Sequence, residues 1–556
     1  MPQCHTGTRI ITHSFHPQLQ CPTIPAMTYS NCGGIIQKTQ KAFFTTCNAQ
    51  PVCWPGQNPA WEGCSPQNGQ NPINVPSCPA QSYVSYYLDA GSNEPLVSPY
   101  VQIAQNYGFA NYFFQTNQGP SERAHDFLFG GTSAPYNNPN QLYYNYFVSD
   151  NPYSNIKGKT PSPVGCEAPS FEYVTYVDPT GLLYVNLQTQ APYQENPCLE
   201  HNTLVDLLDN ASPKLSWKYY TDEPNQIWTA PNAINHICVP VTQPDGSIQC
   251  TGTDFTNNVV PSNNFFNDFS GGGPNLFPPP GQPPYCNLPS VSWIIPDGAF
   301  SDHPGLSQTS GQYSSTQIEG GSNWVAKIVN AVGEANCVEF NGPYKNKTPW
   351  NDTVIFVVWD DWGGWYDHIM GTELFYDNDS YNGGPGCNGT MEYLPSGLSW
   401  GCGYTYGFRV PFLVVSAYTQ NVVSGSCGQG TGISCPNNMP PYVHDFGSVL
   451  AFIEHNFSLG MGCINLSVGS DGVNCNQGTL GNGSFPFADY FAPELQYSRS
   501  PGGQFTIPLQ DFFNLPPQNP QTFVPIIPVQ NSFTDDYFNN FNGPFTDPDN
   551  DMIDND

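Results

Sequence analysis

The chain has 556 residues, of which 44 are acidic and only 13 are Lys or Arg, so its formal net charge is −31. A nucleic-acid partner is not expected, because contacts to phosphates depend on clustered basic side chains. An anionic membrane surface would also repel the protein at long range.

The 19 cysteines are spread along the chain and show no convincing CxxC spacing for a metal site. A disulfide framework in an oxidising compartment is the better interpretation, and the odd number leaves at least one thiol unpaired. Residues 1–30 contain no apolar stretch of signal-peptide length, and no run approaches the ~18 residues of a membrane helix. We therefore expect a secreted or periplasmic protein whose signal peptide is not present in this chain, and no transmembrane segment.

The first half of the chain alternates between irregular and patterned segments. Residues 1–80 form a Cys- and Pro-rich N-terminal segment with little periodicity. Residues 199–220 predict a helix around NTLVDLLDNA, followed by the strand LSWKYY. Residues 244–288 are rich in Pro, Gly and Asn, which indicates a long loop or insertion.

The second half contains the strongest periodic patterns. VSWIIPDG at 291–298 predicts a short buried strand, and NWVAKIVNAVGEA at 323–335 has the apolar spacing of a helix. DTVIFVVWDD at 352–361 and VPFLVVSAYT at 410–419 are β-branched apolar runs, as expected of strands buried on both faces. FGSVLAFIEHNF at 446–457 is helical in pattern.

Strands that alternate with helices predict an α/β fold with a central sheet. We assign one domain to residues 81–500, within which 244–288 is a loop insertion. Residues 501–556 are a Pro- and Asn-rich acidic tail, which we expect to be loosely packed or disordered.

The strongest local signal for chemistry is the adjacent pair Asp360 and Asp361, at the end of the strand predicted over 352–361. Ligands bind at the carboxyl ends of strands in open α/β sheets. Two adjacent carboxylates repel each other unless a cation or a proton neutralises them. Asp367 and His368 follow after a Gly-Gly turn, and oxygen ligands together with imidazole suit a divalent metal. The alternative interpretation is a solvated acidic turn.

Ser121 is the second candidate, because it follows the turn residues Gly119 and Pro120 and precedes a helical pattern. A serine hydroxyl becomes a good nucleophile only when a base or a metal activates it. The structural interpretation is a helix N-cap, and both are compatible, since a helix N-terminus favours an anion.

The chain has ten histidines, and a single His is more often structural than functional. His303 stands beside Asp302, which could orient it, and His236 lies in APNAINHI. His125 and His455 are assigned to structure. Arg409, in YGFRVPF, is expected to pair with a carboxylate near the site.

Taken together, several segments resemble the phosphoesterase family that contains bacterial phospholipase C and acid phosphatase, within the alkaline-phosphatase-like superfamily. They occur in the family's order over residues ~98–460. They are NYFFQTNQGPS with GGTSAP, HNTLVDLLDNASPKLSWKYY, VSWIIPDGAFSDHPG, NWVAKIVNAV, DTVIFVVWDDWGGWYDH, YGFRVPFLVVSAYT and HDFGSVLAFIEHNFSL. The resemblance implies a three-layer α/β/α sandwich with a central, mainly parallel sheet.

The resemblance also implies roles for individual residues. Ser121 matches the nucleophile, which would form a phosphoserine intermediate. Asp360 and Asp361, with Ser121, match the metal ligands, and the cofactor would be a divalent metal ion. His303 matches the histidine near the phosphoryl group, and His236 and His368 match phosphate-contacting or leaving-group residues. The expected protein is a monomeric hydrolase of phosphate esters.

One departure from the family concerns its first strand, which ends in a Glu-Asn pair that supplies further metal ligands. Residues 1–61 contain no Glu and no Asp. A truncated start explains this, and so does a catalytically inactive binding or surface protein on the same fold. A sulfatase-like enzyme would need a CxPxR-type motif, which is not found. The sequence leaves open whether the substrate is a phospholipid or a phosphomonoester, and which metal is bound.

Overall fold

The computed structural model describes parts of the chain between residues 98 and 528. The described ranges are 98–111, 113–116, 121–133, 135, 147–148, 151–154, 163–177, 194–269, 284–296, 300–302, 320–339, 347–361, 392–393, 399–400, 409–419, 422–424, 444–459, 509–513 and 520–528. The predicted segment 1–80 and the candidates His303 and His368 lie outside these ranges, as does most of the predicted tail.

The helices of the described part are short, and the longest of them begins at Gly320. In chain order the α-helices are α2 (Ser98–Asn106), α3 (Ser121–Gly130), α4 (Leu204–Asn210), α5 (Ala230–Ala233), α6 (Asn235–Cys238), α7 (Thr253–Asn258), α8 (Asn264–Phe269), α10 (Gly320–Gly333), α11 (Pro349–Asp352) and α13 (Phe446–Asn456), with 3-10 turns η2 (Gly165–Glu167) and η3 (Gln510–Phe512).

Two sheets carry the strands nearest the candidate site. One has the order β14 (Val354–Val358), β17 (Phe412–Ser416), β1 (Gly108–Ala110) and β18 (Val422–Ser424). The other has the order β10 (Val259–Val260), β7 (Trp217–Tyr220) and β12 (Val291–Ile294).

Small pairings make up the remaining strands. They are β2 (Phe113–Phe114) with β19 (His444–Asp445), β8 (Pro240–Thr242) with β9 (Ile248–Cys250), β11 (Tyr285–Cys286) with β13 (Val338–Glu339), β15 (Glu392–Tyr393) with β16 (Ser399–Trp400), and β5 (Glu172–Val177) with β3 (Phe147–Val148), β4 (Tyr153–Ser154) and β6 (Gln194–Glu195).

The β14–β17 sheet is covered by helices on both faces, which explains its continuous apolar runs. Phe412 and Val414 of β17 pack in a cluster that includes side chains of α3 and α13. Leu413 and Val415 point to the other face and pack with side chains of α2 and α10. All five residues of β17 are buried. The strands predicted over 352–361 and 410–419 are thus confirmed, as are the helices predicted at α10 and α13.

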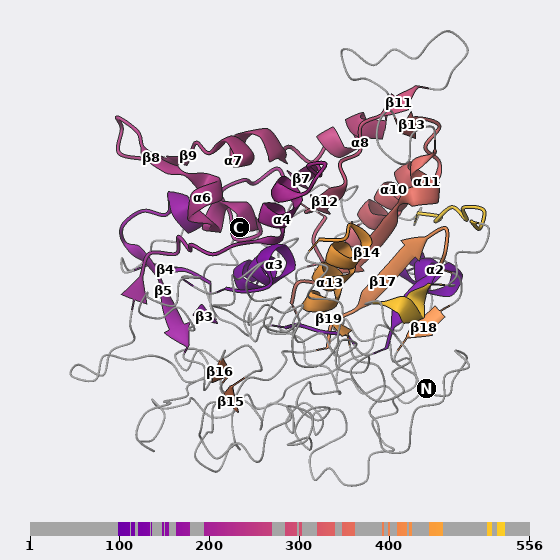
Figure 1. Cartoon of the computed structure of the whole chain (residues 1–556), viewed down its shortest axis with the longest axis horizontal. Helices are drawn as coiled ribbons and strands as arrows, with labels where there is room; N and C mark the ends of the chain where they lie inside the picture. The colour runs from indigo at the N-terminus through magenta and orange to yellow at the C-terminus, as the bar shows by residue number, and fades with distance from the viewer. Residues whose placement is uncertain are drawn as a thin grey trace, which may run out of the picture.

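The second sheet is entirely parallel, because β7 runs parallel to both β10 and β12. The strands predicted in LSWKYY and VSWIIPDG are confirmed as β7 and β12. Figure 1 shows this sheet beside α4, α6 and α7, with β14 and β17 in the other half of the molecule. The described residues of the predicted insertion 244–288 form the short elements β9, α7, β10, α8 and β11.

Three disulfides fasten the part of the chain around the second sheet. They join Cys166 to Cys198, Cys238 to Cys250 and Cys286 to Cys337. Cys286 lies in β11, so the third disulfide joins the end of the predicted insertion to the segment after α10. The predicted disulfide framework is therefore present among the described residues.

The C-terminal segment differs from the expectation of loose packing at two places. Leu509 and Phe512 are fully buried in the cluster that contains Phe412, and Ile526 is 1% exposed. Tyr107 accepts a hydrogen bond from the backbone N–H of Val524 and donates one to its carbonyl. The Pro-rich composition of this segment gave no indication that these apolar residues are buried. Their burial in the core stabilises the packed position of the segment.

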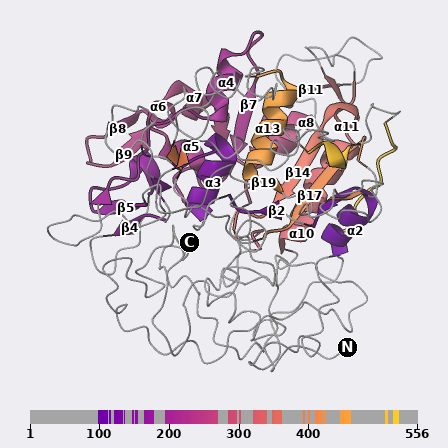
Figure 2. The ribbon, with the colours of Figure 1, turned by 60° about the horizontal axis from the view of Figure 1, so that its bottom comes forward.

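The fold is mixed α/β and includes parallel strands, as predicted at the level of class. The resemblance implied a mainly parallel central sheet, but β17 runs antiparallel to both β14 and β1, and only β18 is parallel to its neighbour in the sheet that leads to the acid pair. No helix in the described ranges is both long and apolar enough to cross a membrane. Figure 2 shows α3 beside α13, and α13 between β7 and β14. These two helices position the candidate site.

Candidate active site

Ser121 and Asp361 meet in the structure although 240 positions separate them. The Ser121 hydroxyl donates a hydrogen bond of 2.9 Å to Oδ2 of Asp361. Both residues are buried, Ser121 at 1% exposure and Asp361 at 7%. A buried hydroxyl that donates to a carboxylate is poised to lose its proton when its oxygen attacks an electrophile.

Ser121 and Asp361 lie at the ends of two different elements, a helix and a strand. Ser121 is the first residue of α3, where the helix dipole favours negative charge, and the next N–H, that of Glu122, donates to Oδ1 of Asn151. Asp361 follows the apolar strand β14 by three residues. The predicted placement of the acid pair at a strand's carboxyl end is confirmed.

Asp360 lies at the same place but points to different partners. Its Oδ2 atom is 3.4 Å from Nε2 of His125, and its carbonyl accepts a hydrogen bond of 3.2 Å from Gln115. The Asp360 side chain is 30% exposed. The two adjacent carboxylates therefore face two different residues of α3.

His125 is a site residue that the sequence interpretation missed, since it assigned this histidine to structure. His125 is one turn after Ser121 in α3, and residues four apart lie on the same face of a helix. Its Nδ1 is 3.2 Å from the Tyr219 hydroxyl, which donates 2.6 Å to the carbonyl of Trp228. The four-residue spacing from Ser121 was the signal that could have identified it.

Asp302, the neighbour of the predicted His303, also reaches this place. Its Oδ2 accepts hydrogen bonds from the Tyr100 hydroxyl (2.8 Å) and from Nε1 of Trp359 (3.1 Å). Burial raises the pKa of Asp302, and these two hydrogen bonds oppose the rise. His303 itself lies outside the described residues, but the segment leading to it ends beside Trp359.

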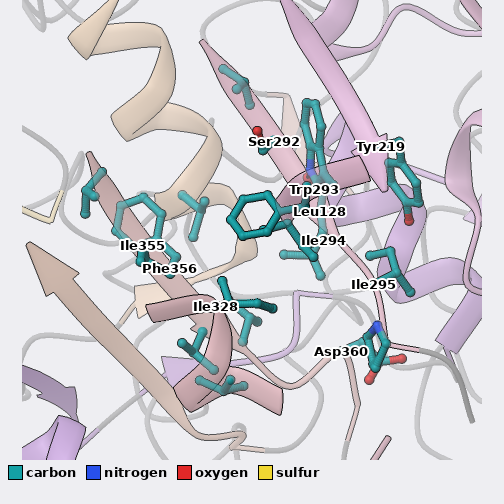
Figure 3. A pocket seen from close by; sticks show the side chains of 18 of the residues that line it. Leu128, Tyr219, Ser292, Trp293, Ile294, Ile295, Ile328, Ile355, Phe356 and Asp360 are labelled. Carbon is teal, nitrogen blue, oxygen red and sulfur yellow. Dashed lines mark hydrogen bonds between the residues drawn. The ribbon is translucent and has the colours of Figure 1, made fainter. Parts of the chain in front are cut away.

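A cavity of about 430 Å³ runs from the acid pair into the interior. Ser121, His125, Asp302 and the acid pair line one end, and apolar side chains from β12, β14, α10 and α13 line the rest. Figure 3 shows Asp360 at this polar end, with Tyr219 and Ile295 near it and Trp293, Ile328 and Phe356 around the apolar part. Polar chemistry thus adjoins a hydrophobic chamber.

The edges of two strands border the cavity. Every residue of β12 and every residue of β14 lines it, whereas a cavity against the face of a strand would meet alternate residues. Among the described strands, β12 pairs only with β7, and β14 pairs only with β17. The cavity therefore separates the two sheets along their facing edges.

A buried cluster of charges follows directly after Ser121. Arg123 forms ion pairs with Glu122 and, at 2.7 Å, with Asp126. All three side chains are buried. Burial raises the pKa of Glu122 and of Asp126, and the Arg123 charge opposes the rise in both. Because a buried charge without its partner is costly, this cluster holds α3 firmly in place.

His236, which the resemblance matches to a residue that contacts the phosphate or the leaving group, lies between two carboxylates. Its Nδ1 lies 3.0 Å from Glu200, and its Nε2 lies 3.2 Å from Asp206 of α4. It is not among the residues that line the cavity. Burial lowers the pKa of His236, but hydrogen bonds to Asp206 and Glu200 outweigh burial and raise it to about 10. A contact with phosphate stays a prediction.

Replacing His236 by Gln is expected to destabilise the protein in a pH-dependent way. The pKa of His236 is raised from its ordinary value to about 10. The stabilisation from its charge is therefore complete below about pH 6.5 and is lost as the pH rises toward 10. The pKa values of Glu200 and Asp206 are lowered, so their contribution disappears only in acid.

Thermal melts of wild type and His236→Gln between pH 6 and 10 check this expectation. The gap in melting temperature should be widest at about pH 6 and should close as the pH approaches about 10. A gap that stays constant across this range contradicts the ion-pair account. The kcat of the same variant tests the predicted contact with phosphate.

Arg409 was expected to pair with a carboxylate near the site. In the structure its Nη1 donates 3.0 Å to the carbonyl of Asn111, and its backbone forms a bridge with Phe114. It therefore ties the residues that lead into β17 to the segment that leads to Ser121.

The donor atoms at the site fit a hard divalent cation by type. Ser121, Asp360 and Asp361 offer hydroxyl and carboxylate oxygens, which such cations prefer. In the described ranges, no group of three or more His, Cys, Asp or Glu residues is arranged to hold a metal ion. The described residues thus supply part of a coordination shell.

A comparison with models of protein families assigns the chain to one family. Residues 81–460 match the model of the Phosphoesterase family. The match covers more than half of the chain and includes Ser121, the acid pair and His125. The protein belongs to the Phosphoesterase family.

Curated relatives match over shorter stretches. A non-hemolytic phospholipase C of Burkholderia pseudomallei is 26% identical over 172 residues, which are 31% of this chain and 19% of that protein. Phospholipase C B of Mycobacterium tuberculosis is 29% identical over 143 residues, 24% of this chain and 21% of that protein. A non-hemolytic phospholipase C of Pseudomonas aeruginosa is 24% identical over 179 residues, 31% of this chain and 20% of that protein. The matched stretches span about a fifth of these relatives' lengths.

Proposed function

We propose that this protein is a metal-dependent hydrolase of phosphate esters in which Ser121 is the nucleophile. The observation that carries the proposal is the buried hydrogen bond from Ser121 to Asp361, 2.9 Å long, at the end of a cavity. Membership of the Phosphoesterase family supports the class of reaction. The names of the relatives make a phospholipid one candidate substrate beside simple phosphomonoesters.

The reaction proceeds in two displacements at phosphorus. Ser121 Oγ forms a bond to phosphorus while the bond to the alcohol oxygen breaks, and its proton passes to Asp361. The departing alcohol takes a proton from an acid, for which His303 beside Asp302 is the proposed residue. Water then attacks the phosphoserine and gives a proton to His303, the bond to Oγ breaks, and Oγ takes back the proton from Asp361. The configuration at phosphorus is retained overall.

A divalent metal ion bound by Asp360, Asp361 and Ser121 would stabilise negative charge on the phosphoryl oxygens and favour the deprotonated hydroxyl. It would also neutralise the local repulsion between a phosphate ester and a protein with a net charge of −31. His236 and His368 are proposed contacts to the phosphate or the leaving group.

The setting of this enzyme is part of the proposal. We propose a secreted or periplasmic monomer, for which the three disulfides are the supporting observation. We also propose that the two sheets belong to one three-layer α/β/α sandwich. Helices on both faces of the β14–β17 sheet and the facing edges of β12 and β14 support this arrangement.

The test is hydrolysis by the purified chain of a chromogenic phosphomonoester and of phosphatidylcholine in vesicles. Each substrate is offered with Mg²⁺, Ca²⁺, Mn²⁺ or Zn²⁺ and with EDTA. We expect turnover that requires a divalent metal and is lost in EDTA, and the preferred substrate identifies the subclass. No turnover with any metal would contradict the proposal and favour a non-catalytic binding protein on the same fold.

A further inference from the structure

The contacts of His125 suggest a second residue of α3 that serves the site. The imidazole lies between two partners: Tyr219 of β7 at Nδ1 and Asp360, after β14, at Nε2. It therefore touches both sheets across the polar end of the cavity. The side chain is only 10% exposed, so neither contact is that of a mobile surface residue.

Hydrogen-bond accounting fixes the direction of the Tyr219 contact. A phenolic hydroxyl has one proton, and that of Tyr219 is donated to the carbonyl of Trp228 at 2.6 Å. The Tyr219 oxygen must therefore accept from Nδ1 of His125. Tyr219 is buried at 1% exposure, so water does not compete for this proton. The carbonyl of Trp228 thus sets the donor and the acceptor in both hydrogen bonds of the series Trp228, Tyr219 and His125.

An imidazole with its first nitrogen fixed in this way presents its second nitrogen in a defined direction. That direction is toward Oδ2 of Asp360, one of the two carboxylates proposed to hold the metal, and Nε2 donates to this oxygen when the ring carries a proton on both nitrogens. A partner behind a reacting or ligating group fixes its orientation, and loss of such a partner costs about 10–100-fold in metal affinity or activity.

We propose that His125 is a positioning residue that holds the Asp360 carboxylate in its working orientation, with Tyr219 as its support. This inference rests on the proposed function, since it assigns Asp360 a task. It gives α3 two roles one turn apart: Ser121 supplies the attacking oxygen, and His125 fixes the carboxylate opposite it. The arrangement couples the nucleophile and the acid pair through one helix.

Two substitutions separate the two nitrogens of His125. The amide nitrogen of Gln lies as many bonds from Cα as Nε2 does, so His125→Gln keeps a donor for Asp360. The amide nitrogen of Asn corresponds to Nδ1, so His125→Asn keeps the contact with Tyr219 and loses the one with Asp360. If His125 positions Asp360, kcat should fall by about 10–100-fold in His125→Asn and much less in His125→Gln.

A purely structural histidine predicts the opposite order, because its buried bond to Tyr219 would be the one that matters. Equal activities, or a larger loss in His125→Gln, would overturn the proposal. His455→Asn is the matched control, since His455 is another helical histidine and is absent from the cavity lining. This control variant measures how much stability is lost when Asn replaces a histidine in a helix. The melting temperatures of all the variants report that loss.

A second measurement does not depend on turnover. The protein has ten histidines, so ring nitrogen signals of selectively ¹⁵N-labelled protein can be assigned with His125→Gln. Asp360→Asn should shift the Nε2 signal of His125, and Tyr219→Phe should shift its Nδ1 signal. An Nε2 signal that ignores Asp360→Asn refutes the positioning role. Absence of hydrolysis with this coupling intact would refute the proposed function alone.

Discussion

Ser121→Ala is expected to reduce the turnover of any phosphate ester by a factor on the order of 10³ or more, because the variant lacks the oxygen that attacks phosphorus. Its Oγ is the atom that donates to Asp361, and Ala removes it without adding bulk. The fold should survive, because the loss amounts to one hydrogen bond, worth about 1 kcal/mol.

Ser133→Ala is the matched control for this variant. Ser133 is also buried, lies just after the other end of α3, and donates 2.5 Å to the carbonyl of Val148. It should lose similar stability and keep its activity. The measurements are kcat/KM and the melting temperature of both variants. Wild-type turnover in Ser121→Ala would remove Ser121 from the mechanism.

Asp361→Asn is expected to lower kcat/KM by a factor on the order of 10² to 10⁴. The amide oxygen can still accept from Ser121, so the geometry is kept. What disappears is the negative charge that takes up the proton of Ser121 and that would hold a cation. Affinity for a divalent metal, measured by calorimetry, should fall together with turnover.

The melting temperature of Asp361→Asn should rise or stay unchanged, although its activity falls. Asp360 and Asp361 are adjacent carboxylates, and removing one charge relieves their repulsion when no metal is present. The melting temperature in EDTA should therefore be at least that of wild type. Asp245→Asn controls for the chemistry of the exchange, because Asp245 lies in an exposed turn, where its carboxylate accepts hydrogen bonds from the backbone N–H and the hydroxyl of Ser247. A parallel loss of stability and activity would indicate a structural role for Asp361.

The elements that the sequence predicted best are those whose environment is uniform along their length. β17 is buried at each position, and apolar from Phe412 to Val415, because helices cover both of its faces, and α10 and α13 show the helical spacing of buried residues. Such patterns can be recognised from the spacing of residues that are close together in the sequence. The strand predicted at 352–361 also located the acid pair.

Contacts between distant segments could not be predicted in this way. Nothing in the spacing of Ser121 and Asp361 indicates their hydrogen bond, and the family resemblance alone suggested that they share a site. His125 was assigned to structure because a single histidine usually is. The ion pairs of His236 depend on α4 and α6 packing together, which periodicity does not encode.

The edge of β14 that borders the cavity has a consequence for water. Backbone amides and carbonyls at a strand edge need hydrogen-bond partners even where the side chains around them are apolar. All five residues of β14 are only partly buried, in contrast to those of its neighbour β17. Water is the partner such groups take wherever no other segment reaches them. Water molecules bound along the backbone of β14 would then lead to Asp361 and Ser121. One of them would be in place to hydrolyse the phosphoserine formed at Ser121.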